Sequence, residues 1–269
     1  MNSPSLCILG CGNIGSAIAR GLEKSNKYIT KNITLTRRKI KSLEIFKNQG
    51  FKISDDNSKA VNKSDIIIIS VGPSQLMDLL DEISNHLNNN KIVISIVSGI
   101  SINNLQSKIG TNIPIIRAMP NTAAGLGESM TCLSTLNGFD TELKTAMSLF
   151  NVLGKTLIID EDQMASATAL GACGIAFFLR AIRAASQGGI EIGFHSDEAF
   201  IIASQTARGA ATLLLEANAH PEAEIDRVTT PKGATIAGLN EMEHKGFSSA
   251  MIKGITTSTE KVSQLFQED

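Results

Sequence analysis

Short hydrophobic runs alternate with amphipathic stretches along the first half of the chain. The runs are rich in Ile and Val and have the length of buried strands, whereas the stretches between them place apolar residues at helical spacing. The predicted strands cover residues 5–9, 33–36, 51–53, 65–71, 91–97, 113–117, 130–133 and 156–159, and the predicted helices cover 13–24, 39–48, 76–87 and 142–152. Apolar strands that alternate with helices predict an α/β fold, with a parallel, doubly wound sheet of the Rossmann type.

The second half of the chain changes character after residue 163. Strand signals disappear, Ala, Gly, Ser and Thr dominate, and the pattern predicts an all-α region. Its predicted helices cover residues 164–192, 196–217, 236–243 and 248–267. The acidic triplet at 160–162 is interpreted as a solvated linker, so the predicted domains are residues 1–160 and residues 161–269. A helical half of this size often buries its apolar faces against a second copy, which predicts a homo-oligomer.

Composition and charge exclude several classes of protein. A chain of 269 residues with 42% hydrophobic residues can bury a large core, and 25 basic against 26 acidic residues leave no net attraction to nucleic acid or anionic lipid. The four Cys contain no CxxC and the four His show no HxxxH or HExxH spacing, so no metal is predicted. No apolar run reaches the ~20 residues of a membrane span, and we expect no signal peptide. We therefore expect a soluble, cytoplasmic protein without a nucleic-acid or membrane partner.

A glycine-rich loop follows the first predicted strand and opens the first predicted helix. Its sequence fits the GxGxxG pattern of dinucleotide-binding domains, and its place between a strand and a helix supports this interpretation. Gly10 permits the tight turn, Gly12 lets the backbone approach a diphosphate, and Gly15 allows close packing of helix on strand. The alternative is a glycine turn without a ligand. The predicted cofactor-binding residues of this loop are Gly10, Gly12, Asn13, Ile14 and Gly15.

The residues after the second predicted strand distinguish NADP from NAD. An NAD site usually has an acidic residue about 20 positions after the glycine loop, which binds the ribose 2′-hydroxyl. Here Thr36, Arg37 and Arg38 occupy that region, and no Asp or Glu occurs between residues 24 and 43. Guanidinium groups and a hydroxyl suit a 2′-phosphate, so NADP(H) is favoured over NAD(H) as the cofactor. The alternative is that the two arginines are the exposed start of a helix.

Two further strand ends are expected at the same edge of the sheet. Val71, Gly72 and Pro73 end one predicted strand, and Ser98 and Gly99 end the next. In an open parallel sheet, ligands bind beyond the carboxyl ends of the strands, so these residues are predicted to lie under the nicotinamide end of the cofactor. Ser98 has an alternative role as the cap of the helix that follows it.

The segment Arg117-Ala118-Met119-Pro120-Asn121-Thr122 resembles the R-x-MPNT segment of pyrroline-5-carboxylate reductases. The resemblance continues along nearly the whole chain and in the same order. Residues 10–17, 55–57, 71–75, 98–100, 168–177 and 220–239 resemble the family's glycine loop, its Asn-bearing loop, and its VKPQ, AGI, TALSGSGPAY and HP…SPGGxT segments. Several motifs in the right order are more specific than any one of them.

The resemblance implies a fold and an activity. Members of the family join a Rossmann domain to a helical domain, and the helical domains interlock into dimers that often assemble into pentamers of dimers. They reduce the cyclic imine 1-pyrroline-5-carboxylate to L-proline with NAD(P)H, the last step of proline biosynthesis. By this resemblance, residues 1–160 form the dinucleotide-binding domain, and residues 161–269 form the dimerisation and substrate-binding domain.

The resemblance also implies roles for particular residues. Thr235 matches the threonine that hydrogen-bonds the ring nitrogen and is the predicted catalytic hydroxyl; its alternative is a helix N-cap. The hydroxyls and backbone N–H groups just before the predicted helix at 236–243 form a candidate anion cradle for the substrate. The further predicted cofactor residues are Asn57, Met119 and Asn121, and the predicted substrate residues are Cys173, Gly174, Thr230, Lys232, Gly233 and Ala234.

The chain departs from the family pattern at the substrate end. Ser, Pro and Tyr of the family's GSGPAY segment are replaced by Cys173, Ile175 and Phe177, and Lys232 stands where the family carries glycine. A divergent 1-pyrroline-5-carboxylate reductase and a paralogue that reduces a related cyclic imine both fit this pattern. A non-catalytic NADP-binding oligomer is a third reading. A dehydrogenase of the β-hydroxyacid type fits poorly, because the helix predicted at 164–192 lacks the lysine that those enzymes use.

Overall fold

A computed structural model describes residues 4–217 and 219–265 of the chain. The chain divides into two compact units. The first holds the chain up to Ala172 together with the C-terminal segment from Ser258, and the second is Cys173–Thr257. The domain boundary expected after residue 160 stays a prediction.

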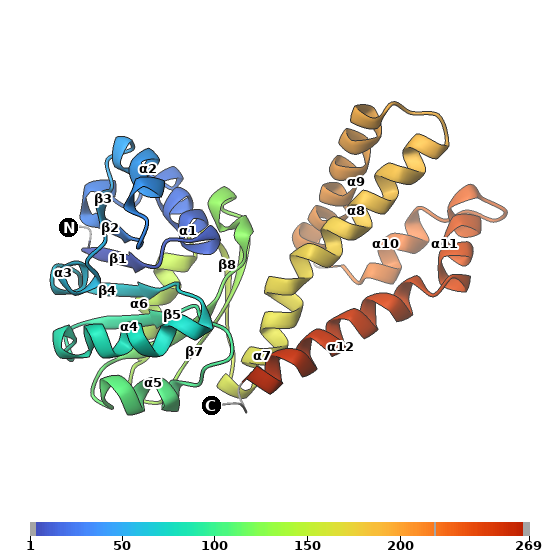
Figure 1. The fold of residues 1–269 in the computed structure, drawn as a ribbon. Helices are drawn as coiled ribbons and strands as arrows, with labels where there is room; N and C mark the ends of the chain where they lie inside the picture. Colours follow the sequence, from blue (N-terminus) through green and yellow to red (C-terminus); the bar gives the residue numbers. More distant parts are fainter. Residues whose placement is uncertain (1–3, 218, 266–269) are drawn as a thin grey trace. The chain divides into compact units, whose positions relative to one another are not determined.

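The first unit is built on an eight-stranded sheet (Figure 1). The strands lie in the order β3-β2-β1-β4-β5-β6-β7-β8. They are β1 (Leu6–Leu9), β2 (Ile33–Thr36), β3 (Lys52–Ser54), β4 (Ile66–Ile69), β5 (Ile92–Ser95), β6 (Ile115–Met119), β7 (Ser129–Thr135) and β8 (Gly154–Ile158). The predicted doubly wound α/β fold is confirmed, and each predicted strand overlaps an observed one.

The expectation of a parallel sheet is wrong for two strands. β6 and β7 pair antiparallel, and β8 pairs parallel to β7, so both run against the other six strands. The physical reason lies in the connection. Only a short 3-10 turn, Thr122–Leu126, followed by Gly127 in the left-handed region, joins β6 to β7. A connection without a crossover helix can join antiparallel strands but not parallel ones.

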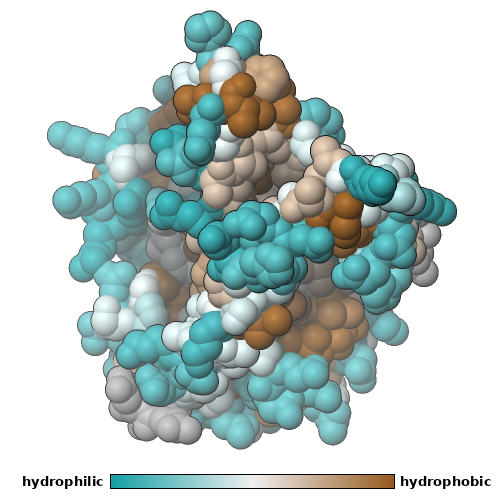
Figure 2. All heavy atoms as spheres, turned by 90° about the vertical axis from the view of Figure 1, so that its right-hand side faces the viewer, coloured by the Kyte–Doolittle hydropathy of each residue, from teal (hydrophilic) through white to brown (hydrophobic). Residues whose placement is uncertain are grey.

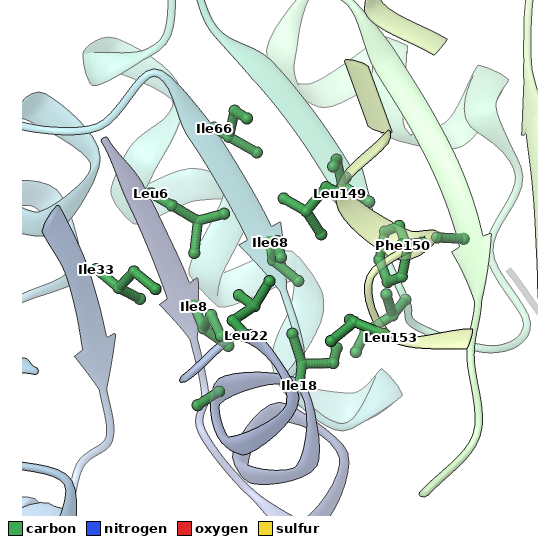
Figure 3. Packing of buried hydrophobic residues seen from close by; sticks show 14 of the residues in the cluster. Leu6, Ile8, Ile18, Leu22, Ile33, Ile66, Ile68, Leu149, Phe150 and Leu153 are labelled. Atoms are coloured by element: carbon green, nitrogen blue, oxygen red, sulfur yellow. The ribbon is translucent and has the colours of Figure 1, made fainter. Parts of the chain in front are cut away.

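Helices cover both faces of the sheet. Those of the first unit are α1 (Asn13–Lys24), α2 (Glu44–Asn48), α3 (Asn57–Asn62), α4 (Leu76–Ile83), α5 (Ile102–Ile109), α6 (Asp140–Phe150) and α7 (Met164–Ala167). Successive strand residues point to opposite faces, so Ile8 packs with α1 and α6 whereas Leu9 packs with α3, α4 and α5. Figure 3 shows the first of these clusters, in which Ile18 and Leu22 of α1 meet the strands. Each such buried side chain contributes about 1.5–3 kcal/mol to folding.

The second unit is helical. It contains α8 (Gly174–Glu191), α9 (Ser196–Ala217), α10 (Pro221–Arg227), α11 (Ala234–His244) and most of α12 (Phe247–Leu265). Gly189 lets α8 and α9 approach closely. A Cβ at that position would lie only 2.9 Å from Cβ of Ala199. The all-α prediction is confirmed for this half. Residues 266 and 267, the end of the helix predicted at 248–267, lie outside the described residues.

The long helix predicted at 164–192 is interrupted. After α7 the residues Thr168–Cys173 form a π-helical turn, and α8 begins at Gly174. A π-turn shifts the i→i−4 hydrogen-bond pattern and is frequent at functional sites. Here it falls within the segment that resembles TALSGSGPAY.

The helical unit exposes many large hydrophobic side chains. Phe178, Ile192, Phe200, Ile201 and Leu215 are each more than half exposed. Figure 2 shows such groups in brown among hydrophilic ones in teal. The stretch Glu161–Glu191 is also long and apolar enough, by length and composition alone, to cross a membrane, with a mean hydropathy of 1.6 and 22% of its apolar window buried. A helix whose apolar side is covered by a second copy of the chain has the same composition. Length and composition therefore do not distinguish a membrane-spanning helix from a helix at a subunit interface.

Candidate active site

The glycine loop turns tightly between β1 and α1. Gly10 has a φ of +80°, and a Cβ at that position would lie 2.4 Å from Cγ1 of Val71. The N–H of Cys11 donates to the carbonyl of Thr36 at 2.8 Å, which fixes the loop against β2. A Cβ on Gly12 would meet only the carbonyl of Gly10 at 3.8 Å, so the backbone there is open to a ligand. The unpaired N–H groups at the start of α1 follow directly, and such groups favour an anion.

The loop opens into a cleft of about 890 Å³ in the first unit. It lies at the carboxyl ends of the parallel strands, where open sheets bind ligands. The cleft brings together these residues predicted from the sequence: Gly10, Gly12, Thr36, Arg37, Arg38, Asn57, Val71 and Gly72. It is also lined by residues outside the predicted cofactor-binding set: Lys39, Asp55, Ser70, Gln75, Asp78, Leu79 and Glu82.

A basic rim, Arg37, Arg38 and Lys39, forms one side of this cleft. All three side chains are exposed, and no ion pair is found for them within the described residues. The alternative reading of the arginines as the start of a helix is wrong, because the 3-10 turn begins later, at Ile40. Both arginines lie in the loop after β2, where they are available to a phosphate.

A relay of hydrogen bonds runs behind the rim. The N–H of Gly10 donates to Oγ1 of Thr36 at 3.3 Å, and that hydroxyl donates to Oδ1 of Asn57 at 2.6 Å. Nδ2 of Asn57 in turn donates to Glu82 at 2.9 Å. Asp56 caps α3 by accepting from the N–H of Lys59 at 2.8 Å, which fixes Asn57 as the first residue of that helix. No sequence motif points to Glu82, which lies 25 residues further along the chain than Asn57.

The remaining predicted cofactor residues lie at neighbouring turns. Asn13, Ile14 and Gly15 form the first turn of α1, Pro73 opens the 3-10 turn Pro73–Gln75, and Ser98 and Gly99 follow β5. A Cβ on Gly15 would lie 2.8 Å from Oγ of Ser70, in keeping with the close packing expected there. The helix-cap alternative for Ser98 is wrong. The cap of α5 is Ser101, whose hydroxyl accepts from the N–H of Asn104 at 3.1 Å.

Asn121 and Met119 have contacts within the protein. Asn121 is buried; its side-chain oxygen accepts from the N–H of Ala123 at 3.0 Å, and its amide donates to the carbonyl of Gly171 at 3.1 Å. Gly171 lies in the π-turn, so Asn121 satisfies a backbone carbonyl of that irregular segment. Met119 packs in a small cluster with Cys132 and Met164. Their assignment to the cofactor stays a prediction.

Glu161 is the residue that sequence reasoning most clearly missed. The sequence predicts a solvated linker at residues 160–162, yet the Glu161 carboxylate accepts from the N–H of Ile102 at 2.6 Å and lies 3.4 Å from Nη1 of Arg117. Arg117 is 1% exposed. Burial lowers the pKa of its guanidinium, and the charge of Glu161 opposes that shift. The linker interpretation is therefore wrong for Glu161, which joins the start of α5 to β6.

Glu161→Gln is expected to destabilise the protein by about 2 kcal/mol. The amide oxygen still accepts from Ile102, but the buried Arg117 loses the negative charge beside it. Urea unfolding at fixed protein concentration measures the loss. Glu241→Gln is the matched control, because its ion pair with Lys245 is exposed and is worth about 0.5 kcal/mol or less. Equal unfolding midpoints for the two variants would show that the Glu161 charge does not stabilise Arg117.

The predicted substrate residues lie in the second unit. Cys173 ends the π-turn, Gly174 begins α8, Thr230, Lys232 and Gly233 lie in the loop between α10 and α11, and Ala234 begins α11. In this loop Gly233 is the N-cap of α11, and no side chain caps that helix. Thr235 is the second residue of α11, and its side chain is exposed. The N-cap alternative for Thr235 is therefore wrong.

Lys232 has a φ of +59°, in the left-handed region that favours glycine. The substitution for the family's glycine thus keeps the glycine-like backbone conformation. A residue with a Cβ pays about 1–2 kcal/mol to adopt it. The next residue, Gly233, is also sterically required, because a Cβ there would lie 2.5 Å from Oγ1 of Thr230.

The cleft fits a dinucleotide. Its glycine loop leaves a cradle that side chains would fill, the helix N-terminus supplies amide donors, and the basic rim supplies unpaired cations. Within the described residues, no group of three or more His, Cys, Asp or Glu side chains could hold a metal ion. This combination of fold and site is that of NADP-dependent oxidoreductases. The sequence model described as "NADP oxidoreductase coenzyme F420-dependent" matches residues 5–99.

Comparisons with known proteins identify the family. The model of the pyrroline-5-carboxylate reductase dimerisation domain matches residues 161–265. Pyrroline-5-carboxylate reductase 2 of Dictyostelium discoideum is 47% identical over 98% of this chain and 93% of its own length. Pyrroline-5-carboxylate reductase 1 of the same organism is 51% identical over 98% of this chain, which spans only 50% of that relative. The chain belongs to the pyrroline-5-carboxylate reductase family.

Solved structures agree with this assignment. The structure of Plasmodium falciparum pyrroline carboxylate reductase with NADP bound superposes with a TM-score of 0.90, at 25% identity and 99% coverage of both chains. The Coxiella burnetii pyrroline-5-carboxylate reductase gives a TM-score of 0.89 at 26% identity, over 98% of this chain and 99% of that one. The helical half thus matches a dimerisation domain, which implies a homo-oligomer.

Proposed function

We propose that this chain reduces 1-pyrroline-5-carboxylate to L-proline with NADPH, the last step of proline biosynthesis. One observation carries the proposal: a single chain of this family keeps both the open glycine cleft with its basic rim and the exposed hydroxyl of Thr235 in the first turn of α11, a helix whose N-terminus no side chain caps. The first arrangement suits a dinucleotide and the second suits a small anionic substrate.

Each group has a role in this reaction. Bound NADPH supplies the hydride that adds to the imine carbon. The N–H groups at the start of α1 hold the diphosphate, and the N–H groups at the start of α11 hold the substrate carboxylate. The hydroxyl of Thr235 donates to the ring nitrogen, which must gain a proton as the C=N bond is reduced. Positioning and hydrogen bonding supply the acceleration without a strong acid.

The preference for NADPH over NADH rests on the basic rim. Three exposed cations that make no ion pair in the described part of the chain suit the two negative charges of a 2′-phosphate. The loop that carries them follows β2 directly, which is the position where an NAD-specific domain places an acid.

Lys232 adds a cation to the substrate loop. We assign it to the substrate carboxylate, because its backbone conformation is unfavourable for lysine and favourable for the glycine that it replaces. The conformational cost of a lysine in the left-handed region implies that its side chain has a function. Residues with strained backbones are common at binding sites.

Assembly and location complete the proposal. The exposed apolar residues of α8 and α9 suit a dimer formed through the helical unit. Five such dimers would form the proposed decamer. The proposed location of the protein is the cytoplasm. Light scattering of the purified protein distinguishes a dimer from a decamer.

The proposed activity is tested by NADPH oxidation with and without DL-1-pyrroline-5-carboxylate. Substrate-dependent loss of NADPH absorbance, with proline as the product, is expected. NADPH that binds but is not oxidised would exclude this substrate. Other cyclic imines would then distinguish a paralogous reductase from a non-catalytic NADP-binding oligomer.

A further inference from the structure

Ser70 interrupts a hydrophobic face at the edge of the cleft. β4 is a run of four isoleucines, Ile66–Ile69, and Ser70 follows it. Side chains alternate along a strand, so Ser70 continues the face of Ile66 and Ile68, which pack in the cluster with α1. The residue is only 8% exposed. Where the preceding residues of this face place apolar side chains against α1, Ser70 places a hydroxyl.

That hydroxyl has no hydrogen-bond partner within the described residues. A buried polar group without a partner destabilises a fold, and nearly all such groups in proteins are paired. Ser64, at the other end of the same strand, shows the usual state: it is also buried, and its hydroxyl donates to the carbonyl of Ala60 at 2.9 Å. The two serines therefore differ in pairing rather than in burial.

The location of Ser70 points to the group that would pair it. Its Oγ lies 2.8 Å from the place of a Cβ on Gly15, so it sits beneath the first turn of α1. Ser70 also lines the cleft, and the next residue, Val71, packs against Gly10. The hydroxyl thus lies on the sheet side of the glycine loop, next to the N–H groups that gather an anion at the helix N-terminus.

We propose that Ser70 is a further binding residue for the dinucleotide, and that its hydroxyl donates to a diphosphate oxygen when the cofactor binds. Rotation about the Cα–Cβ bond, between staggered positions, brings Oγ from beneath Gly15 to the cleft side. A hydrogen bond to a charged oxygen is stronger than one between neutral groups. The inference rests on the NADP dependence of the proposed function, but not on the identity of the imine.

Ser70→Ala tests this role with two measurements. Titration of the full-length protein is expected to show the Kd values for NADPH and NADH both raised, by about tenfold and by the same factor, because the two cofactors share the diphosphate. Thermal unfolding without cofactor is expected to show a Tm that is unchanged or higher by about 2 °C, since an unpaired hydroxyl is removed.

Ser64→Ala is the matched control. It removes a buried hydroxyl that has a partner, at the opposite end of β4 from Ser70. Its Tm is therefore expected to fall, while both Kd values stay unchanged. Unchanged Kd values in Ser70→Ala would overturn the inference, as would weakening for NADPH alone or a wild-type protein that binds neither dinucleotide. Wild-type protein that binds NADPH but reduces no imine would refute the proposed function and leave the Ser70 comparison fully informative.

Discussion

Thr235→Val is expected to lower kcat for 1-pyrroline-5-carboxylate by about 10²–10³-fold, the usual effect of removing one donor to a developing charge. The hydroxyl of Thr235 caps no helix, and its side chain is exposed at the start of α11. Valine has nearly the same shape, so the variant should fold normally. The Kd for NADPH is expected to stay within about twofold, because the described residues that line the cofactor cleft all belong to the first unit.

Steady-state kinetics together with NADPH titration separate these quantities. Thr235→Ser keeps the hydroxyl and is the matched control; it should retain most of the activity. A valine variant with the kcat of the wild type would show that Thr235 does not act on the substrate. A parallel loss of kcat in both variants would instead indicate that the methyl group, and hence packing, is what matters at this position.

The elements of the first unit could be predicted largely from local sequence. A run such as Ile66–Ile69 can be satisfied only by burial on both faces. Gly10 is needed because its φ is positive, and Gly15 because a Cβ there would collide. The start of α1 at Asn13 and the end of α9 at Ala217 were also predicted from the local sequence. These features depend on neighbours in sequence, and a periodic pattern records them well.

Features that depend on distant partners were not predictable. The direction of β7 follows from how the chain turns at Gly127, which no hydrophobic pattern reports. The carbonyl of Gly171, in the π-turn at Thr168–Cys173, accepts from the side-chain amide of Asn121, which lies 50 residues earlier in the chain and has no place in the local pattern. Glu161 reads as one of three solvated acids until the fold brings Arg117 beside it. In each case the deciding contact is long-range.

The candidate site divides in the same way. The glycine loop and the basic rim were predicted from spacing alone, because dinucleotide binding uses a continuous strand–loop–helix segment. The substrate loop carries a weaker local signal, because hydroxyls and backbone N–H groups before a predicted helix indicate only an anion cradle, and the roles of its single residues were assigned by resemblance. Glu82 and Ser70 were missed because one lies on a later helix and the other ends a strand that reads simply as buried core.

Replacing Arg37 and Arg38 together by alanine is expected to raise the Kd for NADPH by about 30–100-fold and the Kd for NADH by less than about threefold. Each guanidinium can give a charge-assisted hydrogen bond to a 2′-phosphate, and such bonds contribute about 1.5–3 kcal/mol before solvent screening. NADH lacks that phosphate, so it loses only a weak, long-range attraction. The two arginines are exposed, so the variant should keep the stability of the wild type.

Lys31→Ala with Lys63→Ala is the matched control for net charge. It also removes two exposed cations from the first unit, but neither lysine lines the cleft. This control should leave both Kd values nearly unchanged. Titrations at two salt concentrations add a second test: NADPH affinity of the wild type should fall with salt more steeply than NADH affinity, and the arginine variant should lose that difference, because exposed charges are screened. An equal loss of affinity for both cofactors would place the arginines elsewhere than at the 2′-phosphate.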